Sequence, residues 1–83
     1  MDAAAAFLRQ DDPVGAALSA HRTAMLGYAF LITRDHHLAE DAAQDAALAL
    51  IAAGDAMDGW AAPRLRAWLM GAVRNRAVEL MRA

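Results

Sequence analysis

Four residues near the middle of the chain have the types and the spacing of a protein-docking surface. Asp41, Gln44, Asp45 and Leu48 fall at i, i+3, i+4 and i+7, which places them on one face of a helix. Three acceptor-rich side chains beside an outward leucine suit contact with a basic partner helix. An ordinary solvated helix face is the alternative interpretation, and the spacing alone favours it.

A second group of residues, near the end of the chain, has the chemistry of nucleic-acid binding. Residues 59–83 carry five arginines and one glutamate, a balance of +4, whereas residues 1–58 carry three arginines and nine acidic residues, a balance of −6. Arginine binds phosphate oxygens and an aromatic ring such as that of Trp60 stacks on bases, as in single-strand binding. A basic helix that balances acidic neighbours is the alternative. Trp68, next to Leu69, is better suited to a core.

The chain lacks the residues of common catalytic and metal sites. It has no cysteine, and its histidines are His21 and the adjacent pair His36 and His37, which point about 100° apart on a helix. Neither a HExxH motif nor a glycine-rich phosphate loop is present. We therefore expect no enzymatic activity, no cofactor and no metal. The longest strongly apolar uncharged stretch, residues 23–33, is too short for a membrane span of about 20 residues.

Three helices must position these groups. Of 49 apolar residues 24 are alanine, which favours helices but supplies little core volume. Cap and stop signals, together with apolar residues at helical spacing, predict an all-α fold: one domain over residues 1–83, built as a compact bundle of three main helices. The expected segments are a short helical arm in 1–11, helices over 13–33 and 35–53, a loop at 54–62, and a final helix from about 63.

The chain contains HRTAMLGYAFLITRD, AEDAAQDAAL and WLMGAVRNRAVELMR, in this order. In this order and at this spacing, the three stretches resemble region 2 of a bacterial sigma factor of the extracytoplasmic-function type. Residues 21–35 (HRTAMLGYAFLITRD) resemble the family's HRPxLLRYA…TGD segment. Residues 39–48 (AEDAAQDAAL) resemble AEDLVQETFL, and residues 68–82 (WLMGAVRNRAVELMR) resemble WLYRIARNRALDLLR. Together with the segments between them, they cover about residues 11–83.

The absence of cysteine favours a cytoplasmic location. The resemblance implies two binding surfaces in a transcription initiation factor. It assigns Asp41, Gln44, Asp45 and Leu48 to the clamp helices of the RNA polymerase β′ subunit. It assigns the loop and the final helix to melting the promoter −10 element and holding its non-template strand. The residues implied for DNA contact are Met57, Trp60, Arg64, Arg66, Arg74, Asn75 and Arg76.

The chain departs from the family pattern in ways that leave an alternative function open. Ala42, Ala43 and Ala47 replace larger apolar residues, which predicts an under-filled core. Met57 and the pair Met70–Gly71 remove stacking and charge from the expected DNA surface. The alternative is therefore a sigma-like interaction module that binds an anti-sigma factor, or polymerase as a decoy, without opening DNA. A self-associating helical bundle is a third possibility. The helix-turn-helix domain with which the family reads the −35 element is not expected within 83 residues.

Overall fold

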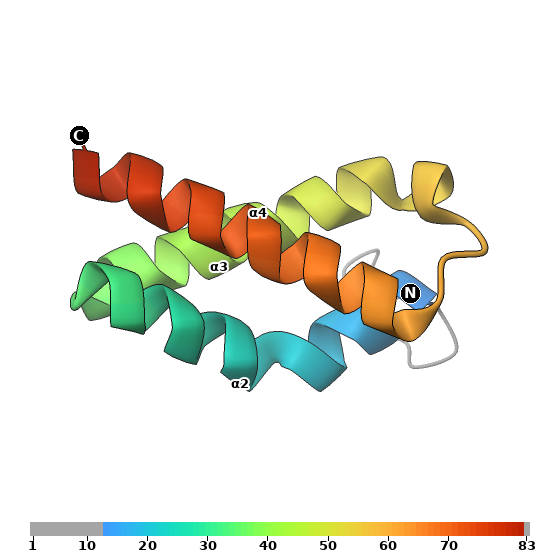
Figure 1. Cartoon of the computed structure of the whole chain (residues 1–83), viewed down its shortest axis with the longest axis horizontal. Coiled ribbons are helices and arrows are strands. Elements are labelled where there is room, and N and C mark those ends of the chain that lie inside the picture. The colour runs from blue at the N-terminus through green and yellow to red at the C-terminus, as the bar shows by residue number, and fades with distance from the viewer. Residues whose placement is uncertain (1–12, 83) are drawn as a thin grey trace, which may run out of the picture.

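The computed structural model describes residues 13–82, and these form three long helices joined by short connections (Figure 1). Helix α2 spans Pro13–Thr33, α3 spans His36–Ala53, and α4 spans Ala62–Arg82. A short 3-10 helix, η1, spans Gly54–Met57. The predicted all-α bundle of three main helices is confirmed. The helical arm expected in residues 1–11 lies outside the described residues.

The reversal between α2 and α3 takes only two residues because local side chains satisfy its backbone. Arg34 adopts a left-handed conformation, with φ of 54°, and its N–H donates to the carbonyl of Phe30 at 2.8 Å. Asp35 then caps α3, as predicted: its Oδ1 accepts from the backbone N–H groups of His37 and Leu38 at 2.9 and 3.0 Å. The buried Thr33 hydroxyl donates to the Asp35 carbonyl at 3.1 Å. The first residues of α3 are thereby fixed.

Gly54 follows the last residue of α3, as predicted, but it does not adopt the left-handed conformation common in a C-terminal glycine. Its φ and ψ are −49° and −46°, so the chain continues helically into η1, which takes up the first four residues of the expected loop. A Cβ on Gly54 would lie 3.2 Å from Cγ2 of Val14 on α2, so glycine here permits a close approach of two elements. The left-handed glycine of this connection is Gly59, with φ of 82°.

The core lies where the three helices meet, and alanine makes up much of it. The largest fully buried side chains are Leu50 of α3 and Leu69 and Val73 of α4. An open groove of about 580 Å³ lies between α2 and α3, and Ala43 and Ala47, two of the alanines that replace larger apolar residues, line it. Arg22 and Glu40 are among its polar lining residues, and its apolar lining consists of Leu18, Met25, Leu26, Ala43, Ala47 and Ile51.

Candidate functional site

The predicted docking face, Asp41, Gln44, Asp45 and Leu48, lies along α3. Asp41, Gln44 and Leu48 are exposed, and Leu48 keeps 55% of its surface accessible, which confirms its outward placement. Gln44 also lines the groove beside α2. The face therefore offers two exposed polar side chains and one exposed apolar side chain to a partner.

Asp45 differs from the other three because it already has an ionic partner within the domain. The Nε–H of Arg76 on α4 donates to Oδ2 of Asp45 at 2.6 Å, and Nη1 of Arg76 donates to Oε2 of Glu79 at 3.1 Å. Hydrogen bonds to Asp45 and then to Glu79 raise the pKa of the Arg76 guanidinium above its ordinary value. These contacts explain why an arginine stands within the apolar arc of the last helix.

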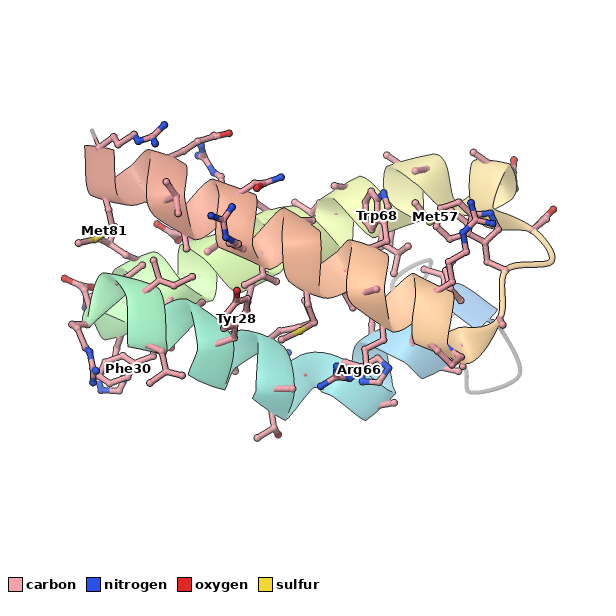
Figure 2. All side chains as sticks on the ribbon, in the orientation of Figure 1. Tyr28, Phe30, Met57, Arg66, Trp68 and Met81 are labelled. Carbon is pink, nitrogen blue, oxygen red and sulfur yellow. The ribbon has the colours of Figure 1, made fainter. Side chains whose placement is uncertain are left out.

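The expected DNA-contact residues do not form one patch. Arg64, Arg66, Arg74 and Asn75 are exposed. Because successive residues rotate by about 100°, Arg74 and Arg76 point to nearly opposite sides of α4. Nη1 of Arg74 donates to Oδ1 of the adjacent Asn75 at 3.5 Å. Figure 2 shows Arg66 projecting from the first turns of α4 toward α2.

The connection between η1 and α4 brings Trp60 and Arg64 together. The Arg64 Cζ lies 3.6 Å from a ring centroid of Trp60, so the guanidinium covers one side of the indole. Trp60 is partly buried against the core, and its backbone N–H donates to the Met57 carbonyl at 3.1 Å. This turn therefore presents an aromatic ring and a cation side by side at one end of the bundle.

Met57, expected to touch DNA, is only 6% exposed and packs within the core (Figure 2). A contact between its side chain and DNA would require that side chain to leave the core. In the described structure Met57 anchors the connection that carries Trp60. The neighbouring tryptophan on α4, Trp68, packs against the core as its apolar neighbours predict.

The Sigma-70 region 2 family model matches residues 17–83. The chain belongs to this family. No curated protein and no solved structure matches the chain. Membership of the sigma-70 region 2 family implies binding to core RNA polymerase and recognition of the promoter −10 element in general. It is a family of transcription factor domains and not one of enzymes.

The described part of this sigma region 2 domain contains neither membrane-spanning helices nor clustered metal-binding groups. Within residues 13–82, no helix has the length and apolar character to cross a membrane. In the same part of the chain, no group of three or more histidines and carboxylates is arranged to hold a metal ion. Sequence reasoning named Arg76 as a DNA-contact residue and missed its ion pair with Asp45 of α3. Its only signal in the sequence was an arginine at a core-facing helical position.

Proposed function

We propose that this domain acts in a cytoplasmic sigma factor of the extracytoplasmic-function type. It docks on the β′ clamp helices of core RNA polymerase through the α3 face and holds the non-template strand of the −10 element with the loop and α4. The observation that carries the proposal is that two groups lie apart on the domain. Asp41, Gln44 and Leu48 are exposed on α3, and the partly buried Trp60 pairs with the exposed Arg64 at the turn into α4.

Docking through α3 combines charge and apolar burial. Asp41 and Gln44 present acceptors to basic side chains of the partner, which gives orientation and fast association. Leu48 is 55% exposed, and covering that surface contributes about 1 kcal/mol, roughly half the value for burying a whole leucine side chain. This modest contact area predicts that the charges on α3 determine much of the affinity.

Strand capture uses the turn that carries Trp60 and Arg64, together with the side of α4 that carries Arg74 and Asn75. A base extruded from the duplex loses a few kcal/mol of stacking and pairing, which contacts with protein must offset. Stacking on an aromatic ring such as Trp60 returns about 1–3 kcal/mol for each base. Arg64, Arg74 and Asn75 supply donors for phosphates and base edges on exposed parts of the loop end and α4.

Capture of core RNA polymerase tests the docking proposal. The double variant Asp41→Arg/Asp45→Arg reverses two charges of the face and should abolish capture. Asp55→Arg/Asp58→Arg is the matched control, because it reverses two exposed acidic residues at η1, outside the face. Equal capture of the double variant and the wild type would refute docking through α3.

A second candidate function is the interaction module that binds an anti-sigma factor or acts as a polymerase decoy. The burial of Met57 and the absence of charge at Met70–Gly71 favour it, because both reduce what the domain offers to DNA. Titration of a labelled −10-like single strand separates the two functions. Salt-dependent binding that Arg74→Ala weakens supports strand capture, whereas no binding at low salt supports the interaction module.

A further inference from the structure

The docking face contains one carboxylate that is occupied before any partner arrives. Arg76 donates from Nε to Oδ2 of Asp45 at 2.6 Å across the α3–α4 contact, whereas no ion pair is recorded for Asp41 within residues 13–82. The two acidic residues of the face therefore differ in how readily they can bind a cation of the partner. Asp41 binds it directly, and Asp45 must first exchange its present partner.

The Asp45–Arg76 pair is accessible enough for such an exchange. Each of the two side chains retains 43% of its surface exposed. Ion pairs with this exposure contribute little net stability, because water solvates the separated charges nearly as well. Glu79, 3.1 Å from Nη1 of Arg76, remains as a carboxylate partner if Asp45 is withdrawn. Breaking the pair therefore leaves no buried or isolated charge.

We propose that a cationic side chain of the docking partner replaces Arg76 as the ionic partner of Asp45. Docking then exchanges the Arg76 guanidinium for a guanidinium or ammonium group of the partner. This inference rests on the proposed docking through α3. It also assigns Arg76 to positioning and partner exchange and not to phosphate contact. Arg76 faces α3, on nearly the opposite side of α4 from Arg74.

Removal of the internal competitor is the direct test. Arg76→Met keeps a long unbranched side chain and removes the charge, so Asp45 becomes available to the partner. We expect the Kd for core RNA polymerase at low salt to fall about two- to fivefold, the range of an exposed ion pair. In an Asp45→Asn background the same change should have no effect. Arg74→Met is the matched control, because it removes a cation from the opposite side of α4.

The measurement is fluorescence anisotropy of labelled domain titrated with core polymerase, with thermal melts to establish folding. Equal affinities for Arg76→Met and Arg74→Met, or a gain that persists with Asp45→Asn, would overturn the exchange. Arg76→Lys keeps the cation but loses the Nε–H donor and should give a smaller gain, which serves as the test if Arg76→Met does not fold. Failure of the docking proposal is separate: it appears as an Asp41→Arg variant that binds as tightly as wild type.

Discussion

Gly71 offers a quantitative test of the proposed DNA surface. It lies in the interior of α4, three and four residues before Arg74 and Asn75, and therefore on the same side of the helix. A Cβ at this position meets no atom within 4 Å, so a side chain fits without displacing a neighbour. Gly71→Arg should place a third polar group beside Arg74 and Asn75 and restore charge that the family pattern supplies there.

The expected magnitudes follow from helix propensity and from counterion release. Replacing an interior helical glycine by alanine stabilises by about 1 kcal/mol, and by arginine slightly less. For a domain of this size, 1 kcal/mol raises Tm by about 4–8 °C. Each additional phosphate neutralised on a single strand steepens the slope of log K against log salt by about 0.7. Gly71→Ala should therefore change Tm alone, whereas Gly71→Arg should change Tm and the slope.

The assay is fluorescence anisotropy of a labelled −10-like single strand at four or more salt concentrations. Gly27 provides the matched control, because it is an exposed interior glycine of α2 whose Cβ position is also open. Gly27→Arg adds the same charge and a similar helix stabilisation away from Arg74. A Gly71→Arg slope equal to that of the wild type or of Gly27→Arg would refute the placement of phosphates along this side of α4.

Three further substitutions test the cap, the core and the loop. Asp35→Ala removes the α3 cap and should cost about 1 kcal/mol, or roughly 4–8 °C in Tm by thermal circular dichroism; an unchanged Tm contradicts it. Leu50→Ala empties a fully buried site and should lower the free energy of unfolding by about 2–5 kcal/mol, so denaturant titration should find little folded protein. A loss of well under about 2 kcal/mol contradicts this prediction. Trp60→Ala should weaken single-strand binding at least about fivefold, the lower bound for one stacked base, and Arg64→Ala should weaken it less. Binding by Trp60→Ala as tight as that of the wild type argues against stacking.

The helices could be predicted from local signals, and the loop between them only in part. Asp35 caps α3 through its own backbone neighbours, so a local pattern is sufficient to locate it. Gly54 looked like a helix terminator, but its role is to let α3 approach Val14 of α2, forty residues earlier in the chain. The short helix η1 could not be predicted from the sequence, because neither a cap residue nor an apolar repeat distinguishes four residues of 3-10 helix from a loop.

The candidate site divides in the same way. Periodicity placed Asp41, Gln44 and Leu48 on one outer face, because the spacing of 3.6 residues per turn is a property of the helix itself. The burial of Met57 was not predictable, since the loop sequence does not show which of its side chains packs against the helices. The pairing of Trp60 with Arg64 was equally hidden, because it depends on how the turn at Gly59 directs the chain into α4.

Local patterns in the sequence are sufficient to predict that this chain forms helices, where they begin, and how its charge divides between an acidic α3 and a basic α4. Those properties depend on neighbours within a few turns. The ion pair between Asp45 and Arg76 could not be predicted in this way, because the two residues were assigned to different surfaces and lie 31 residues apart. That contact depends on how α3 and α4 pack, which the alanine-rich core sets through long-range burial and not through any local pattern.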